Sequence, residues 1–184
     1  PERVAGQARR EDVDALPLSG KVALVTGANT GIGRVTATEL ARQGAQVFLA
    51  CRSEEKTRPV LADIAARSGG RARAEFLPLD LGELGSVRNC AQEFLARGLP
   101  LHILVNNAGL AGQRGITPSG FELAFGVCHV GHFLLTSLLL DQLKASAPAR
   151  IVVVASTAHR QARSGIDFSR LRRRTVSITG LPEY

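Results

Sequence analysis

Residues 21–33, KVALVTGANTGIG, predict a buried β-strand that runs into a glycine-rich turn and then into a helix. The apolar run has strand length, and Gly27, Gly31 and Gly33 punctuate the residues after it. Such a turn lets backbone N–H groups and the positive end of a helix face a phosphate. Glycine is needed there because a Cβ would block the ligand or because φ must be positive. The flanking strand and helix are the context that a phosphate-binding turn requires.

The composition indicates one globular domain. The chain has 184 residues, of which 45% are hydrophobic, enough to bury a core. It starts at Pro1 and contains no Met, so we expect it not to be a complete primary translation product. No apolar run reaches the roughly 18–20 residues of a membrane span, and no start resembles a signal peptide. Three cysteines without metal-like spacing favour reduced thiols and a cytoplasmic protein.

The net charge of +7 is unevenly placed, because residues 158–184 carry six Arg against two acidic residues. A basic patch attracts nucleic acid or another anionic surface. No aromatic interleaving and no nucleic-acid motif accompany these arginines. We therefore expect no nucleic-acid partner, and a nucleic-acid module would have to show affinity that falls steeply with salt.

Strands and helices alternate along the chain after a surface leader at residues 1–19. We expect strands at the opening stretch, 46–51, 74–80, 101–105 and 151–155, and helices at 32–43, 54–67, 83–97 and 121–145. After the strand at 151–155, we expect an Arg-rich loop to residue 184. Continuous apolar strands between helices predict a parallel sheet covered on both faces, a doubly wound α/β domain. Such domains bind ligands beyond the carboxyl ends of their strands. Those ends carry Gly27, Arg52, Asp80, Asn107 and Ser156.

Four motifs in order resemble the short-chain dehydrogenase/reductase family. TGANTGIG at 26–33 is similar to its TGxxxGxG, NNAG at 106–109 is the same in both, Asp80-Leu81 resembles its adenine-side acidic pair, and Ser156 after IVVVA resembles its catalytic serine. ANTGIG, LACR and GHFLLT most resemble the retinol-dehydrogenase-like branch and its bacterial relatives. The resemblance implies a Rossmann-type NADP-binding domain at 20–184 that lacks the C-terminal strands and helices of a complete member.

The cofactor prediction rests on the end of the second strand. A carboxylate there usually selects NAD by accepting from the ribose 2′-OH, whereas this strand ends in Arg52. Because a guanidinium pairs well with a phosphate, Arg52 favours NADP(H), with Arg34 as a possible second cation. Arg52 could also be a solvated surface residue, and Asp80 could cap the helix that starts near Glu83. The cofactor-binding residues implied by the family motifs are Gly27, Asn29, Thr30, Gly31, Ile32, Gly33, Arg52, Asp80, Leu81, Asn107, Ala108, Gly109 and Tyr184.

The resemblance also implies catalytic roles. In the family a serine holds the carbonyl oxygen, a tyrosine gives up the proton, and a lysine four residues later favours the phenolate. Ser156 and Tyr184 match the first two, and an asparagine that supports a water-linked proton path is replaced by Cys128. Cys128 still offers a backbone carbonyl but no amide side chain. The alternatives are a strand-end serine, a frayed terminal tyrosine and a buried helix cysteine without chemistry.

We therefore expect an NADP(H)-dependent carbonyl reductase or alcohol dehydrogenase with a small apolar substrate, and little reductase activity from these 184 residues alone. The alternative is a non-catalytic nucleotide-binding protein of the same fold. His129 and His132 are spaced as metal ligands can be, but with no third ligand evident we expect packing or backbone hydrogen bonds and no metal. The helix at 121–145 could pair across a homo-oligomer interface or serve an internal core.

Overall fold

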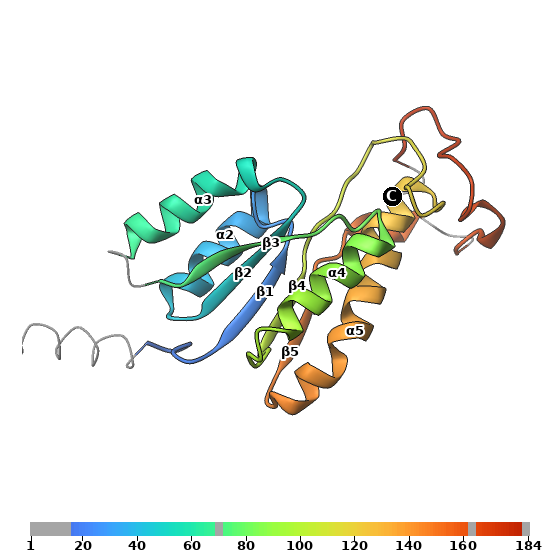
Figure 1. Ribbon diagram of the computed structural model, residues 1–184. Helices are drawn as coiled ribbons and strands as arrows, with labels where there is room; N and C mark the ends of the chain where they lie inside the picture. The colour runs from blue at the N-terminus through green and yellow to red at the C-terminus, as the bar shows by residue number, and fades with distance from the viewer. Residues whose placement is uncertain (1–15, 69–71, 162–164, 182–184) are drawn as a thin grey trace, which may run out of the picture.

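A computed structural model describes residues 16–68, 72–161 and 165–181. Within them, one parallel sheet has the strand order β3-β2-β1-β4-β5. The strands are β1 (Val22–Thr26), β2 (Gln46–Cys51), β3 (Ala74–Pro78), β4 (Ile103–Asn106) and β5 (Arg150–Val153). Helices α2 (Gly31–Arg42) and α3 (Glu54–Arg67) cover one face, and α4 (Leu84–Leu95) and α5 (Gly131–Ala145) cover the other (Figure 1). The predicted doubly wound α/β fold is confirmed.

The core has two halves because successive residues of a strand face opposite sides of the sheet. In β1, Leu24 packs with the cluster under α4 and α5, whereas Ala23 and Val25 pack with the cluster under α2 and α3. Phe48 of β2 and Phe94 of α4 meet edge to face, with ring centroids 5.2 Å apart. Both rings are fully buried, so this pair anchors α4 to the sheet.

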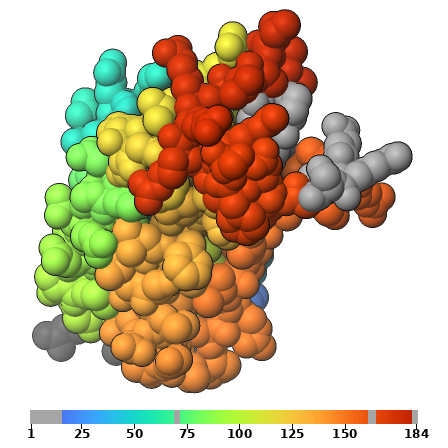
Figure 2. Space-filling model, turned by 90° about the vertical axis from the view of Figure 1, so that its right-hand side faces the viewer, coloured from blue at the N-terminus to red at the C-terminus, as the bar shows by residue number. Residues whose placement is uncertain are grey.

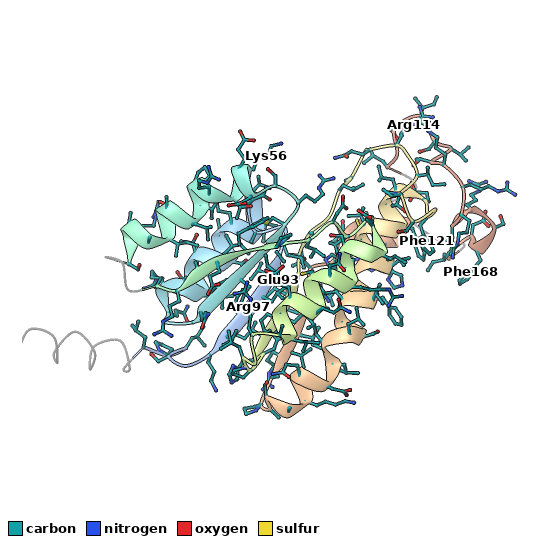
Figure 3. The ribbon with its side chains drawn as sticks, in the orientation of Figure 1. Lys56, Glu93, Arg97, Arg114, Phe121 and Phe168 are labelled. Atoms are coloured by element: carbon teal, nitrogen blue, oxygen red, sulfur yellow. The ribbon has the colours of Figure 1, made fainter. Side chains whose placement is uncertain are left out.

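Arg97, just after the end of α4 (Figure 3), contacts this aromatic pair. Its guanidinium carbon lies 5.0 Å from the centroid of the Phe48 ring, within the range of a cation–π contact. The same guanidinium pairs with Glu75 of β3 at 2.6 Å and with Glu93 of α4 at 3.1 Å. One side chain therefore ties α4 to two neighbouring strands.

The predicted boundaries hold where local capping chemistry sets them. The predicted strand at 46–51 and helix at 54–67 match β2 and α3. Ser53 caps α3 by accepting a hydrogen bond from the backbone N–H of Lys56 at 3.2 Å. Gly44 follows the end of α2 with φ +97°, the left-handed conformation expected after a helix terminus.

The region predicted as one helix at 121–145 has two parts. Residues 125–130 form a π-helical turn, and α5 follows it. The N–H of Gly131 reaches the carbonyl of Gly126, the longer-range bond of a π turn. Residues 121 and 122 precede the helix, where Glu122 forms an isolated bridge with Ile116. The apolar residues alone did not distinguish these conformations.

The last strand is the most exposed one. β5 starts one residue before the predicted strand and ends at Val153, two residues short of it. As a sheet edge it leaves Ile151, Val152 and Val153 between 43% and 66% exposed, in contrast to the buried β1. Within the described residues, β5 is therefore an unpaired, apolar edge of the sheet, as expected of a sheet that ends at this strand.

The Arg-rich segment, described at 157–161 and 165–181, lies against the loop that precedes the π-helical turn (Figure 2). Thr175 N donates to the carbonyl of Gly115 at 3.0 Å, and Glu122 N donates to the carbonyl of Leu171 at 2.8 Å. The segment contains two short 3-10 turns rather than loop alone.

The ends of the chain are described only in part. Of the predicted leader, residues 1–15 lie outside the described residues, and 16–19 form a turn that contacts the end of α2. In the described part of the chain, no helix is both long and apolar enough to cross a bilayer.

Candidate functional site: a glycine-rich rim

The glycine-rich turn is packed closely on the loop that follows β4. Gly27 has φ +65°, and a Cβ there would lie 2.9 Å from the Cα of Ala108. Gly33 begins the packed part of α2, where a Cβ would lie 2.5 Å from the carbonyl oxygen of Gly27. Neither position accepts a side chain without movement of backbone. The turn is therefore held tightly by its neighbours on the protein side.

The ligand side of the turn is open. Apart from the chain neighbours of Gly31 and the adjoining backbone of α2, no heavy atom of the described residues lies within 4 Å of where a Cβ of Gly31 would stand, and Ile32 is 68% exposed. Thr30, the N-cap of α2, makes no side-chain capping bond, and the first turn of α2 contains no acidic residue. Its terminal N–H groups and helix dipole remain available for an anion. The turn fits the pyrophosphate of a dinucleotide.

Asn107 clamps the turn to the neighbouring strand. Its side-chain Nδ2 donates to the carbonyl of Thr26 at 2.8 Å and, more weakly, to that of Gly27 at 3.5 Å. Its backbone N–H and that of Ala108 both donate to Thr26 Oγ1 at 2.9 Å. The structure therefore brings the two motifs together as predicted. The Asn107 side chain binds protein backbone, which makes it a support for the turn.

Arg52 stands exposed at the carboxyl end of β2, on the same edge of the sheet. It makes no ion pair with any other residue that the structure describes, so its guanidinium is available to a ligand. Arg34 behaves differently, because it pairs with Asp63 of α3 at 3.3 Å. The expectation that Arg34 is a second phosphate-binding cation is not supported by this pairing.

Asp80 and Leu81 follow β3 and have different surroundings. Asp80 is half-buried, and its Oδ1 accepts the backbone N–H of Gly82 at 2.9 Å. The alternative of a cap for α4 is wrong, since the N-cap of α4 is Glu83. Leu81 is only 4% exposed and belongs to the core under α4 and α5, so its side chain does not face the rim. Gly109, at the β4 loop, is exposed and lies beside Cys128.

Ser156 lies just past β5, where its Oγ accepts the N–H of Ala158 at 3.1 Å. The hydroxyl proton has no acceptor among the described residues, so it remains free for a substrate oxygen. Cys128 lies in the π-helical turn, and its Sγ is 3.8 Å from the carbonyl oxygen of Leu110. Burial raises the pKa of the Cys128 thiol, which therefore stays protonated near neutral pH. Tyr184 lies outside the described residues.

His132 is the residue at this rim whose position the sequence did not reveal. It is buried in α5, with Nδ1 2.9 Å from the carbonyl oxygen of Cys128 and Nε2 2.8 Å from Thr26 Oγ1. The predicted backbone hydrogen bond is confirmed, but the bond to Thr26 was not foreseen. No group of three metal-ligating side chains occurs in residues 16–68, 72–161 and 165–181. The only sequence signal was a histidine on the apolar helix four residues after Cys128.

A parallel doubly wound sheet with an open glycine turn at the centre of its carboxyl edge defines a dinucleotide-binding domain. The family model described as short chain dehydrogenase matches residues 21–167. The chain therefore belongs to the short-chain dehydrogenase family, within its retinol-dehydrogenase-like branch.

Named relatives support the branch. The chain is 51% identical over 154 residues to dehydrogenase/reductase SDR family member 13 of Bos taurus, covering 84% of this chain and 40% of that protein. It is 48% identical over 165 residues to retinol dehydrogenase 11 of Homo sapiens, covering 89% of this chain and 51% of that protein. A solved RhlG/NADP active-site complex of Pseudomonas aeruginosa matches with 30% identity and a TM-score of 0.64, covering 83% of this chain and 61% of that chain. The chain thus spans about half the length of these two sequence relatives.

Proposed function

We propose that the protein is an NADP(H)-dependent oxidoreductase that interconverts an alcohol and a carbonyl compound. The observation that carries this proposal is the free N-terminus of α2, which has neither a side-chain cap nor an acidic residue and opens toward solvent beside Gly31. When bound there, NADP(H) supplies or accepts the hydride. The family and the relatives named as dehydrogenases support the same reaction type.

The preference for NADP(H) follows from Arg52. Its guanidinium, without an ion-pair partner in the described part of the chain, stands where the adenosine ribose of a dinucleotide is expected, at the end of β2. A 2′-phosphate would accept two hydrogen bonds from it, whereas the 2′-OH of NADH offers no charge. The nearest carboxylates along the chain, Glu54 and Glu55, do not stand at the end of β2. They lie in the first turn of α3, where their negative charge interacts favourably with the helix dipole. A solved NADP complex among the structural relatives supports this choice.

The proposed chemistry places two groups at the substrate oxygen. Ser156 would donate a hydrogen bond from its free hydroxyl to the carbonyl oxygen and so hold that oxygen in place. By the family resemblance, Tyr184 would give up the proton that the developing alkoxide takes. The substrate is proposed to be a small apolar alcohol or carbonyl compound, as the name of retinol dehydrogenase 11 suggests for that relative.

Cofactor titration tests the first part of the proposal. NADPH and NADH would be titrated into the full-length protein while their fluorescence is followed, and we expect NADPH to bind more tightly. Arg52→Ala should weaken NADPH binding by roughly 10- to 100-fold, because a charged hydrogen bond is worth about 1.5–3 kcal/mol, and should leave NADH binding nearly unchanged. Arg58→Ala is the matched control, since Arg58 is an exposed arginine of α3 that pairs with Glu54. Tighter binding of NADH by the unmodified protein would contradict the cofactor assignment.

A measurement of turnover separates an enzyme from a non-catalytic nucleotide-binding protein. The non-catalytic alternative is favoured by Cys128, which stands where the family has an asparagine. NADPH oxidation would be followed with a panel of apolar aldehydes and ketones. We expect Ser156→Ala to abolish most turnover while NADPH still binds, and Thr157→Ala to retain it. Binding without turnover in the unmodified full-length protein would favour the non-catalytic alternative. Residues 1–184 alone should oxidise NADPH slowly, and near-full turnover by them would contradict the role of groups beyond Tyr184.

A further inference from the structure

A chain of buried hydrogen bonds links α5 to the glycine-rich turn. His132, only 6% exposed, stands between the carbonyl oxygen of Cys128 and the hydroxyl of Thr26. Thr26 is the last residue of β1 and is fully buried. The imidazole therefore bridges the π-helical turn and the strand that leads into Gly27. It crosses an interface that is otherwise built mainly from apolar side chains.

The direction of each hydrogen bond follows from its partners. The carbonyl of Cys128 can only accept, so His132 Nδ1 must carry the proton. Two backbone N–H groups, those of Asn107 and Ala108, already donate to Thr26 Oγ1. The hydroxyl proton of Thr26 then goes to His132 Nε2 at 2.8 Å rather than to the carbonyl of Val105 at 3.4 Å. Burial lowers the pKa of His132, which agrees with this neutral tautomer.

All the bonds of this chain point the same way. They run from the N–H groups of Asn107 and Ala108 to Thr26, from Thr26 to His132, and from His132 to the carbonyl of Cys128. Aligned hydrogen bonds in a low-dielectric interior polarise one another. An unpaired buried member leaves its neighbours weaker or unsatisfied. A change at His132 is therefore transmitted to the loop on which Gly27 packs.

We propose that His132 is a positioning residue that locks the glycine-rich turn to the π-helical turn carrying Cys128, through Thr26. Within the described residues, the hydrogen bonds of the side chain go to Thr26 and to Cys128 and not to the glycines of the turn, so its effect on cofactor binding is indirect. The consequence for NADP(H) rests on the function proposed above. The lock itself belongs to the cofactor-free protein and is measurable there.

Two variants test the two hydrogen bonds of the His132 ring separately. His132→Asn places an amide near the position of Nδ1, which retains a donor to Cys128 and removes the acceptor for Thr26. His132→Gln reaches the position of Nε2, which retains the acceptor for Thr26 and removes the donor to Cys128. His129→Gln is the matched control, because His129 lies exposed on the same helical region and stacks on Phe125 and Phe133 instead.

The first readout is amide hydrogen exchange in the full-length protein without cofactor. We expect His132→Asn to speed exchange at Asn107 and Ala108 on the order of tenfold, the equivalent of one buried hydrogen bond. His132→Gln should change this exchange less than threefold, roughly the spread between a retained and a weakened bond. His129→Gln should not change it. Titration with NADPH is the second readout, and the affinity should fall for His132→Asn in proportion to the faster exchange.

Each outcome decides the proposal. Equal exchange in His132→Asn and the control, with only a lower melting temperature, would show that His132 merely packs and would overturn it. Faster exchange with unchanged NADPH affinity, in a protein that binds NADPH, would support the lock and refute its indirect effect on cofactor binding. If the unmodified protein binds no NADPH, the proposed function fails. The exchange rates of the His132 variants then still show whether His132 holds the two turns together. Nitrogen-15 shifts of His132 in the unmodified protein need no variant, and a proton found on Nε2 would refute the chain of bonds.

Discussion

Replacing Gly33 with alanine tests how closely α2 must approach the turn that precedes it. The new methyl group would lie 2.5 Å from the carbonyl oxygen of Gly27 and would contact the side-chain amide of Asn107. That amide is not free to move, because its Nδ2 donates to the carbonyl of Thr26 at 2.8 Å. The substitution therefore forces the turn and α2 apart.

Two costs add in the Gly33→Ala protein. Overpacking a filled site costs about 1–3 kcal/mol, and breaking the bond between Asn107 and Thr26 costs about 1–3 kcal/mol more. We expect the free energy of unfolding to fall by about 2–6 kcal/mol in total. Gly85→Ala is the matched control in α4, since its methyl group would meet only Glu83 Oε1 at 3.8 Å among the described residues. There the helix should gain about 0.5–1 kcal/mol.

Urea unfolding of the full-length proteins measures both changes. The 184 residues contain no Trp, so circular dichroism at helix wavelengths is the suitable signal. NADPH affinity would be measured on the folded variants in parallel and should fall for Gly33→Ala alone. A Gly33→Ala protein within about 0.5 kcal/mol of the unmodified one would refute the close packing of α2 on the turn.

Three further predictions concern other parts of the fold. Thr175→Val should cost about 1–3 kcal/mol and speed proteolysis of the Arg-rich segment, whereas Thr175→Ser should not, because the buried hydroxyl bonds Glu122 and Gly115. Phe94→Ala should lower the free energy of unfolding by about 3–5 kcal/mol in urea titrations, more than Phe94→Leu, since Phe94 is fully buried. Burial lowers the pKa of His132 in the folded protein. Just below pH about 6.5, the His132 ring therefore takes up a second proton in the unfolded chain but not in the folded one. Stability should therefore fall with falling pH there, with a smaller slope in His132→Gln.

The elements that the sequence predicted best are those fixed by short-range chemistry. Ser53 caps the start of α3 and Gly44 follows the end of α2, so these two helix boundaries could be predicted from the residues next to them. The glycine spacing likewise foretold the turn at Gly27, because positive φ and close packing leave few alternatives to glycine. These features need no knowledge of distant contacts.

The features that the sequence did not predict depend on partners far along the chain. The π-helical turn at 125–130 has the same apolar pattern as the helix after it, so periodicity could not separate them. His132 looked like a packing residue until its partner, Thr26, was placed beside it by the fold. The docking of the Arg-rich segment depends on Glu122 and Thr175, whose types alone predict no contact. Tyr184, and with it half of the proposed chemistry, lies outside the described residues.

The strand order also fixes when the cofactor site can exist during synthesis. β1 leaves the ribosome first among the described strands, and it pairs with β2 soon afterwards. The other edge of β1 pairs with β4, which is made much later. The contact between Gly27 and Asn107 likewise joins residues 80 positions apart. Closing so long a loop costs entropy before any contact repays it. The glycine-rich turn of the nascent chain therefore lacks its support from Asn107 until the 80 residues that follow Gly27 have been made, and a ligand present before then would meet an unsupported turn.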